Sequence, residues 1–367
     1  MKLSASHISI KTKRSARKLP LCALAVSFVV STSVANGSAL VKPDQEYLEC
    51  GSRPEMGTPF KICLVIKAHQ KAQAREDIAA SFKEIQNINS WMSDWLPETE
   101  LSLVNQSAGE KPVKVGADLL RVLRETLAVA SDSSGALDPS FNVMWGTYSF
   151  KKGEEREATD EEIRTRLPLI DWRKVIVDPE NSTIFLKDKG MKIGLGAVGQ
   201  SYAADRIVEL MKKKKYVGGF VDGSGDTVFW GHKPGGALWT TGVRDPTNKD
   251  AVLLRIYGTD FAITTCGDDE KYFFRDGRRV HHVLDPKTGR PAMKSRQVTV
   301  IAKRGFTADA WDTAAFVIGA DLAIPLLEKK GLRAIFVEPD GTVKLTKGLK
   351  KESSSWGEGY IVTGALK

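Results

Sequence analysis

The spacing of hydrophobic residues predicts a strand and two helices in the first half of this chain. Residues 60–67 have the alternation of a strand, with Ile62, Leu64 and Ile66 on one face. Between residues 78 and 95, apolar side chains repeat every three or four positions and predict a long amphipathic helix that ends near Pro97. Residues 120–130 repeat in the same way and predict a second helix. Residues 151–166 are charged and weakly patterned, and we interpret them as a surface insertion.

The second half of the chain has a pattern that is typical of β-strands. One helix is predicted at 202–214, with Ser201 as its N-cap, and a strand–helix–helix–strand order is predicted after residue 297. No internal repeat or linker divides the chain. We therefore predict an α+β fold in which two interlocked α/β halves form a single large domain. Short apolar runs separated by turn residues predict the other strands, at 174–178, 183–187, 218–222, 227–230, 252–257 and 260–265.

The first 35 residues have the order of a secretory signal. Six Lys and Arg residues and no acid precede an apolar run over 19–30, and small residues follow that run. The run is shorter than the roughly 20 residues of a transmembrane helix. We therefore expect cleavage and a periplasmic protein, although an uncleaved signal would anchor the chain to the inner membrane. The rest divides into a segment 36–55 of undetermined order, a domain over 56–350 and a tail at 351–367.

Most of the basic charge of the chain belongs to this signal. The whole sequence holds 54 Lys and Arg against 45 Asp and Glu, and subtracting the six cations of the signal leaves 48 against 45. A net charge near +3 argues against a nucleic-acid partner. The remaining basic run, residues 212–215, falls at the end of a predicted helix, where cations suit the helix dipole.

Three cysteines remain after cleavage. In an oxidising compartment Cys50 and Cys63 could form a disulfide, which would leave Cys266 free. Cys63 also lies in the strand predicted at 60–67, where it could equally be a core residue. The sequence leaves both interpretations open.

Two carboxylates and a hydroxyl stand at helical spacing late in the chain. Asp309, Asp312 and Thr313 occupy positions i, i+3 and i+4, which share one face of a helix. Carboxylate and hydroxyl oxygens are hard ligands that suit Mg²⁺ better than Zn²⁺. The structural alternative is a helix N-terminus with Asp309 as the N-cap and a further acid in the first turn.

A Gly-rich turn and a His–Asp loop supply two further candidate groups. Residues 194–200 run directly into a predicted helix, and such a turn offers free N–H groups to a phosphate; the structural alternative is a tight strand-to-helix turn. His282 precedes Asp285 in a turn sequence, where it could shuttle a proton with Asp285 orienting it, or could simply be a packed residue. The chain has no CxxC, HExxH or GxSxG motif, so zinc, dithiol and serine-nucleophile chemistries have no support.

Together these elements resemble the FAD:protein FMN transferase family, also called the ApbE family. The resemblance spans residues 56–341 and implies an exported, T-fold-like domain that uses Mg²⁺. It also implies that FAD is cleaved at its pyrophosphate, that FMN passes to a Thr of an acceptor protein in an exported or membrane-bound redox system, and that AMP leaves. The motifs that carry it are Met-Gly-Thr at 56–58, Gly-Ala-Leu-Asp-Pro at 135–139, His-Val-Leu-Asp-Pro at 282–286, Thr-Gly at 288–289 and Ala-Asp-x-x-x-Thr at 308–313.

The resemblance also implies roles for individual residues. His282 is expected to be the base that activates the acceptor hydroxyl, with Asp285 beside it. The metal is expected to bind the Ala197 carbonyl and the side chains of Asp309, Asp312 and Thr313. The flavin and adenine are expected to contact Met56, Trp95, Ala136, Leu137, Asp138, Gln200 and Val283.

The chain departs from the family pattern in and near the Gly-rich turn. The family usually has Asp where Gly194 stands and Lys where Gln200 stands, and it commonly has Gly at Ser201 and Ser at Cys266. Each lost polar partner would weaken FAD binding by about 1–3 kcal/mol. Three activities stay open: an FMN transferase, a Mg²⁺-dependent FAD pyrophosphatase with water as acceptor, and a flavin-binding protein without catalysis. We predict the transferase, because the residues for the metal and the base are all present.

Overall fold

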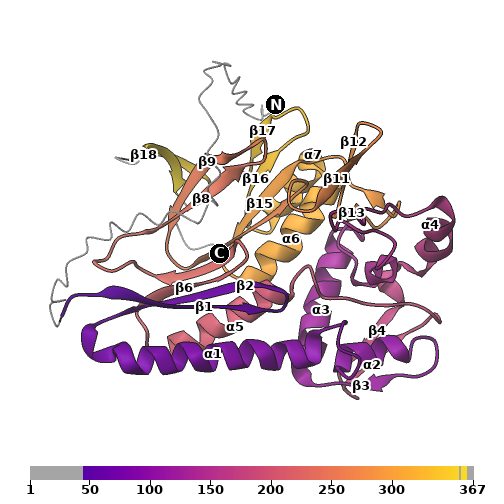
Figure 1. Cartoon of the computed structure of the whole chain (residues 1–367), viewed down its shortest axis with the longest axis horizontal. Coiled ribbons are helices and arrows are strands. Elements are labelled where there is room, and N and C mark those ends of the chain that lie inside the picture. The colour runs from indigo at the N-terminus through magenta and orange to yellow at the C-terminus, as the bar shows by residue number, and fades with distance from the viewer. Residues whose placement is uncertain (1–43, 355–356, 362–367) are drawn as a thin grey trace.

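An eight-stranded antiparallel sheet forms the centre of the molecule (Figure 1). The structure is a computed structural model that describes residues 44–354 and 357–361, so the predicted signal lies outside the described residues. The strands predicted at 60–67, 218–222, 227–230 and 260–265 are confirmed as members of this sheet. In spatial order its strands are β1 (Tyr47–Glu55), β2 (Thr58–Ile66), β6 (Gly218–Gly223), β7 (Asp226–Gly231), β10 (Phe261–Gly267), β15 (Gln297–Ala302), β16 (Arg333–Val337) and β17 (Val343–Leu345).

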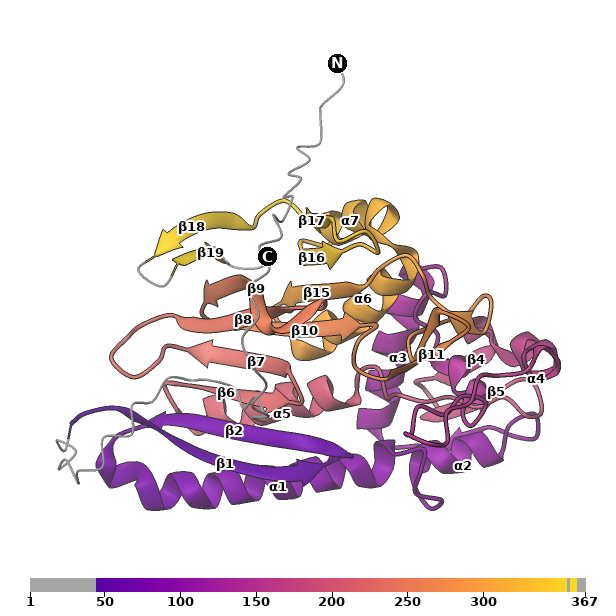
Figure 2. The same ribbon diagram turned by 45° about the horizontal axis from the view of Figure 1, so that its top comes forward.

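Helices cover one face of this sheet (Figures 1 and 2). Helix α1 (Lys71–Met92) packs on β1 and β2, and α5 (Gly199–Lys213) packs on β6 and β7. Helix α6 (Gly305–Ile318) packs on β10 and β15, and α7 (Ala320–Lys329) packs on β16. These elements confirm the helices predicted at 78–95 and 202–214 and the strand–helix–helix–strand order after residue 297. The apolar faces of the helices and the sheet together bury the main hydrophobic core.

A smaller sheet covers the opposite face. Trp239 and Ile256 from this sheet share a second hydrophobic cluster with Phe229, Phe261 and Ile301 from the large sheet. Because the central strands are covered on both faces, all six residues of β15 are buried. The strands of the smaller sheet are β8 (Trp239–Asp245), β9 (Asn248–Gly258), β18 (Lys350–Ser354) and β19 (Gly357–Ile361), and β9 confirms the strand predicted at 252–257.

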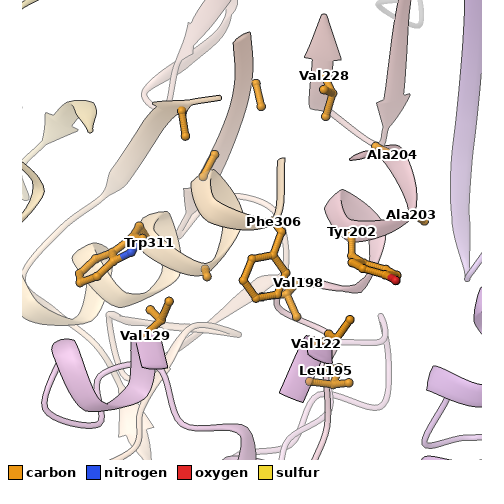
Figure 3. Close-up of a cluster of buried hydrophobic side chains, with 14 of the residues drawn as sticks. Val122, Val129, Leu195, Val198, Tyr202, Ala203, Ala204, Val228, Phe306 and Trp311 are labelled. Atoms are coloured by element: carbon orange, nitrogen blue, oxygen red, sulfur yellow. The ribbon is translucent and has the colours of Figure 1, made fainter. Parts of the chain in front are cut away.

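A lobe of short elements packs against one end of the helical layer (Figure 1). Val122 and Val129 of its longest helix, α3 (Ala117–Asp132), face Phe306 and Trp311 of α6 (Figure 3). Helix α3 and the lobe strands confirm the predictions at 120–130, 174–178 and 183–187. The other lobe elements are α2 (Glu100–Gln106), α4 (Asp160–Arg166), β3 (Val113–Lys114), β4 (Val175–Asp178), β5 (Thr183–Leu186) and the 3₁₀ helix η2 (Pro139–Met144).

The hydrophobic core runs without interruption from the lobe into the helical layer, so the chain forms one mixed α/β domain, as predicted. Two small hairpins complete it, β11 (Tyr272–Arg275) with β12 (Arg278–His281), and β13 (Leu284–Asp285) with β14 (Arg290–Pro291). None of the helices in the described part of the chain is both long and apolar enough to cross a membrane.

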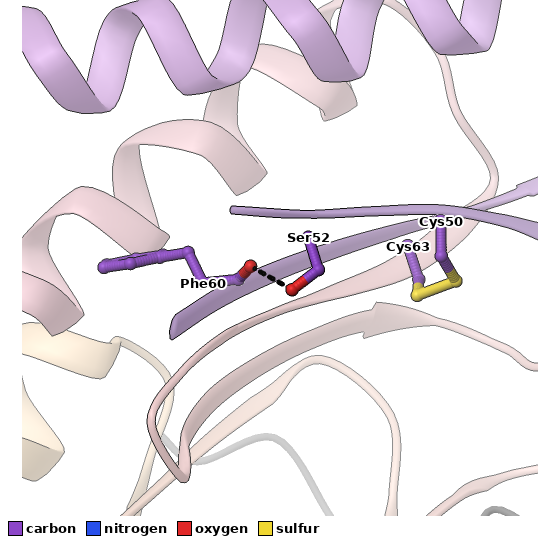
Figure 4. The surroundings of a disulfide bond; sticks show 4 residues. All are labelled: Cys50, Ser52, Phe60 and Cys63. Atoms are coloured by element: carbon purple, nitrogen blue, oxygen red, sulfur yellow. Dashed lines mark hydrogen bonds between the residues drawn. A yellow bond between two sulfur atoms is a disulfide. The ribbon is translucent and has the colours of Figure 1, made fainter. Parts of the chain in front are cut away.

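The β1–β2 hairpin is closed at its end by a tight turn and is linked along its length by a disulfide. Figure 4 shows the disulfide. Met56 and Gly57 form the turn with φ angles of 49° and 79°, the left-handed region that a two-residue hairpin turn requires. Cys50 lies opposite Cys63 in the strand register, and the two form the disulfide. Of the two interpretations left open for these cysteines, the structure supports the disulfide, and Cys266 is free.

Candidate functional site

The Gly-rich turn at 194–200 leads directly into α5, as predicted. The N–H groups of Val198 and Gly199 donate to the Leu195 carbonyl at 3.1 and 2.8 Å and close the turn. Helix α5 therefore begins at Gly199 with Val198 as its N-cap, and none of the described side chains caps it. The prediction that Ser201 is the N-cap is wrong, because the turn has already brought the backbone into the helix two residues earlier. The uncapped N-terminus leaves backbone donors that an anion could use.

Asn142 occupies the space beside Gly194. A Cβ atom placed on Gly194 would come within 2.8 Å of Cγ of Asn142, which is closer than real Cβ contacts. The Asn142 side chain is held there because its Nδ2 donates to Asp94 Oδ2 at 2.8 Å and to the Ile193 carbonyl at 3.1 Å. The Gly at this position is thus matched to its neighbour, and the larger residue that is usual in the family would displace Asn142.

Helix α6 is capped by a side chain from α5 rather than by Asp309. Asp205 accepts the N–H of Gly305 at 2.6 Å and the N–H of Phe306 at 3.0 Å, so it satisfies the first two donors of α6. Burial raises the pKa of Asp205 to about 6, while these backbone donors act in the opposite direction. Since α6 begins at Gly305, Asp309 lies in its second turn, and the N-cap interpretation of Asp309 does not apply.

Asp309 and Asp312 are buried on α6, where their exposed fractions are 9% and 2%. Burial raises the pKa of Asp309 well above its usual range, and the negative charge of Asp312 adds to this effect. Burial likewise raises the pKa of Asp312. Thr313 donates from its Oγ1 to Asp312 Oδ1 at 3.2 Å. The helical spacing thus brings these three side chains together, as the sequence predicted.

A third carboxylate, Asp226 at the start of β7, joins this group and was not predicted. Burial raises the pKa of Asp226 well above the usual range, and the negative charge of Asp309 raises it further. The charge of Asp226 in turn raises the pKa of Asp312. The N–H of Thr265 donates to Asp226 Oδ1 at 3.3 Å, which fixes the carboxylate on the sheet. Its only sequence signal is the tight turn at 223–225 that precedes it, and a turn of that kind is common between strands.

This group fits a hard divalent cation, although the described residues do not form a complete ligand set. Among them, no three His, Cys, Asp or Glu side chains are arranged to hold a metal by themselves. Buried carboxylates that raise one another's pKa are unfavourable without a compensating positive charge. The carboxylates and the Thr hydroxyl are oxygen donors that suit Mg²⁺, which commonly completes its shell with water and substrate phosphate. Ala197 is half-buried in the Gly-rich turn, and its role as a carbonyl ligand stays a prediction.

His282 follows β12 and is half-buried beside Phe150. Its ring meets Phe150 edge-on at 6.4 Å between centroids, and its backbone N–H donates to the Lys271 carbonyl at 3.1 Å. Burial lowers its pKa to about 4, and the charges of Lys271 and His281 act in the same direction. At neutral pH the imidazole is therefore uncharged, which is the form that accepts a proton.

Asp285 does not orient His282 through a hydrogen bond within the described residues. Its Oδ1 instead accepts the N–H of Lys287 at 2.9 Å, which shapes the turn between β13 and β14. The Nδ1 atom of His282 has no hydrogen-bond partner in the described part of the chain. The role of Asp285 beside the base stays a prediction.

The residues predicted to contact the flavin and adenine lie in several elements. Met56 reaches the Gly-rich turn, because a Cβ on Gly199 would lie 3.4 Å from its Cε. Trp95 is 66% exposed and packs edge-on against the equally accessible Trp145, at 4.3 Å between ring centroids. Such a pair of exposed aromatic side chains is a suitable surface for a planar ring. The other members include Ala136, Leu137 and Val283, which are buried, and Gln200, which is half-buried in the first turn of α5.

Asp138 has a structural role in this arrangement. Its Oδ1 accepts the N–H and the hydroxyl of Ser140 at 2.8 and 2.6 Å, and its Oδ2 accepts the N–H of Trp172 at 3.0 Å. The carboxylate therefore caps η2 and ties the lobe together. Contact between Asp138 and a nucleotide stays a prediction.

Comparisons with known proteins identify the family. The sequence model of the ApbE family matches residues 56–336. The FAD:protein FMN transferase of Treponema pallidum (strain Nichols) is 30% identical over 327 residues, which cover 82% of this chain and 90% of that protein. The FAD:protein FMN transferase of Klebsiella pneumoniae (strain 342) is 27% identical and covers 84% of this chain and 94% of its own length.

Solved structures agree with the sequence comparison. The crystal structure of the ApbE protein of Thermotoga maritima superposes with a TM-score of 0.75 at 29% identity and covers 83% of this chain and 97% of its own. The apo flavinyl transferase ApbE of Pseudomonas stutzeri, at 22% identity, shares the fold with a TM-score of 0.72. The curated relatives show that the protein is an enzyme of the transferase class. The chain belongs to the ApbE family.

Proposed function

We propose that this protein transfers FMN from FAD to the hydroxyl of a Thr in an exported redox protein and releases AMP, in a reaction that depends on Mg²⁺. The names of the relatives support flavin transfer. The observation that carries the proposal is the cluster of buried carboxylates on α6 beside the uncapped N-terminus of α5. This pairing suits a substrate that brings phosphates and a cation together.

The cation would bind the side chains of Asp309, Asp312 and Thr313 and the carbonyl of Ala197. When bound, it neutralises charge on the pyrophosphate of FAD. Donors at the N-terminus of α5 stabilise the same anion through the helix dipole. The charge of Asp226 acts on Asp312, and this third carboxylate strengthens the attraction of the group for a cation.

His282 would be the general base. Its low pKa leaves the ring neutral at pH 7, so it can take the proton of the Thr hydroxyl. The Thr oxygen then forms a bond to the flavin-side phosphorus while the bond from that phosphorus to the bridging oxygen breaks. AMP leaves with the bridging oxygen, and His282 passes the proton on to solvent, because a ring with a pKa of about 4 does not keep it at pH 7.

We also propose that the protein works outside the cytoplasm, in the periplasm. The signal pattern of residues 1–35 supports export. The Cys50–Cys63 disulfide supports it independently, because such bonds persist in oxidising compartments.

Product analysis tests this proposal against its alternatives. The mature protein would be incubated with FAD and Mg²⁺, with and without a Thr-containing acceptor protein, and AMP, free FMN and protein-bound flavin would be measured. The transferase predicts one bound flavin for each AMP, and only in the presence of the acceptor. AMP with an equal amount of free FMN would instead identify a pyrophosphatase, and FAD that stays intact but bound would identify a binding protein.

A further inference from the structure

A cavity of about 190 Å³, lined by polar residues together with the apolar Ala292, Met293 and Pro339, lies beside His281, the neighbour of His282 in the sequence. Asp268, Arg279, His281, Ser295 and Arg296 line it, and none of them belongs to the proposed flavin site. Its frame is tied to the large sheet, because the N–H of Asp268 donates to the Arg296 carbonyl at 2.9 Å and the N–H of Arg296 donates to Val337 at 2.8 Å. The cavity is therefore a built feature rather than a gap in a loose loop.

Two buried polar atoms on its wall have no hydrogen-bond partner. His281 and Ser295 are only 2% and 3% exposed. Within the described residues, neither the Nδ1 atom of His281 nor the Oγ atom of Ser295 makes a hydrogen bond. Buried polar groups in proteins are nearly always paired. The Ser295 hydroxyl is therefore a free donor for a partner that enters the cavity, whereas the ring N–H of His281 is already bonded to the Ala292 backbone.

The charges of the cavity favour an anion with a single negative charge. Asp268 accepts from Nη1 of Arg279 at 2.6 Å and lies 3.5 Å from Nε of Arg296, so one carboxylate faces two guanidinium groups. Arg279 is further held over the ring of Tyr272, with 4.4 Å from its Cζ to the ring centroid. Each guanidinium has five N–H donors, more than Asp268 can use. A dianion would meet repulsion from Asp268, whereas a monoanion balances the remaining positive charge.

We propose that this cavity binds a small monoanionic carboxylate. The Ser295 hydroxyl and the remaining N–H groups of Arg279 and Arg296 donate to the carboxylate oxygens. His281 lies beside these donors and can report on binding, but its ring N–H is already used by the Ala292 backbone, so its Nδ1 is not one of the donors. The carboxylate has two sources, a free organic acid or an acidic side chain of a protein segment that docks beside His282.

Side-chain NMR of the mature protein labelled with ¹⁵N-histidine tests the proposal. Acetate would be titrated at constant ionic strength, and the ring signals of His281 and of the exposed His232 would be followed. We expect a saturable shift at His281 alone. Arg296→Gln should weaken binding about tenfold or more, and Ser295→Ala should weaken it several-fold, the ranges for a charged and a neutral hydrogen bond. Arg164→Gln, an exposed control on α4, should leave binding unchanged.

Two further probes separate the sources. Tighter binding of a blocked aspartate, N-acetyl-aspartyl N-methylamide, than of acetate points to a protein segment, and the reverse order points to a free acid. Inorganic phosphate that binds more tightly than acetate would contradict the monoanion. A shift that never saturates, that sodium chloride reproduces, or that survives in both Arg296→Gln and Ser295→Ala would overturn the proposal and leave the cavity as a site for water.

Discussion

Replacing Gly194 by Asp tests whether local packing explains the departure of this chain from its family. The new Cβ would lie 2.8 Å from Cγ and 3.0 Å from Oδ1 of Asn142. Asn142 must therefore rotate away and lose its hydrogen bonds to Asp94 and to the Ile193 carbonyl. A hydrogen bond to a charged group contributes about 1.5–3 kcal/mol and a neutral one about 0.5–1.5 kcal/mol. We therefore expect Gly194→Asp to lower the free energy of unfolding by about 2–4 kcal/mol.

Urea unfolding of five proteins would measure this effect: the wild type, Gly194→Asp, Gly194→Ala, Asn142→Ala and the double variant Gly194→Asp/Asn142→Ala. Gly194→Ala is the matched control, because it adds the Cβ without the carboxylate and should lose a similar amount. The double variant should be no less stable than Asn142→Ala, since the clash is then gone. The packing explanation fails if Gly194→Asp stays within about 0.5 kcal/mol of the wild type, or if the two single losses add in the double variant.

Three further predictions concern the metal, the disulfide and the flavin surface. The pKa of Asp312 is raised in the folded state, so the metal-free protein should lose stability as pH rises above about 4 through the raised pKa. In thermal melts, Asp312→Asn should reduce this loss and abolish any stabilisation by Mg²⁺. An unchanged response to Mg²⁺ would contradict the ligand assignment. The disulfide joins two cysteines that are 13 residues apart in the sequence, and Cys50→Ala/Cys63→Ala removes this cross-link from the unfolded chain. The double variant should lose about 3 kcal/mol of unfolding free energy in urea. A loss below about 1 kcal/mol would speak against the bond. Trp95→Ala should weaken FAD binding about 5- to 100-fold in a fluorescence titration, and an unchanged Kd would remove Trp95 from the site.

The helices and central strands could be predicted because their periodicity records burial. In β2 and α1 the apolar positions match the faces that the core covers. Strand β1 gave no such signal, since it is polar and contains Pro54. It forms because it is the edge strand of the large sheet and because the disulfide holds it to β2. A strand that is held by pairing with its neighbour and by a cross-link, rather than by a buried face of its own, leaves little trace in local spacing.

The same limit applies to the site. The face shared by Asp309, Asp312 and Thr313 could be predicted from helical spacing alone. The N-cap of α6 could not, because Asp205 reaches it from another helix across a sequence separation of 100 residues. Asp226 and Asn142 likewise reach the site only through the packing of the sheet and the lobe. Residues that share one face of a helix can be recognised from their spacing in the sequence. Contacts between side chains of different elements become visible only in the folded structure.

Intact mass spectrometry of a Thr-containing acceptor protein, after incubation with the enzyme, FAD and Mg²⁺, tests the central proposal most directly. The wild type should add the mass of one FMN phosphoester, and the addition should disappear with EDTA, with His282→Ala and with an acceptor whose Thr is replaced by Ala. The control variant His232→Ala, which removes an exposed histidine outside the motif segments, should retain full transfer. An acceptor that keeps its mass with the wild-type enzyme, or that gains FMN equally with His282→Ala, would contradict the proposed transfer and its base.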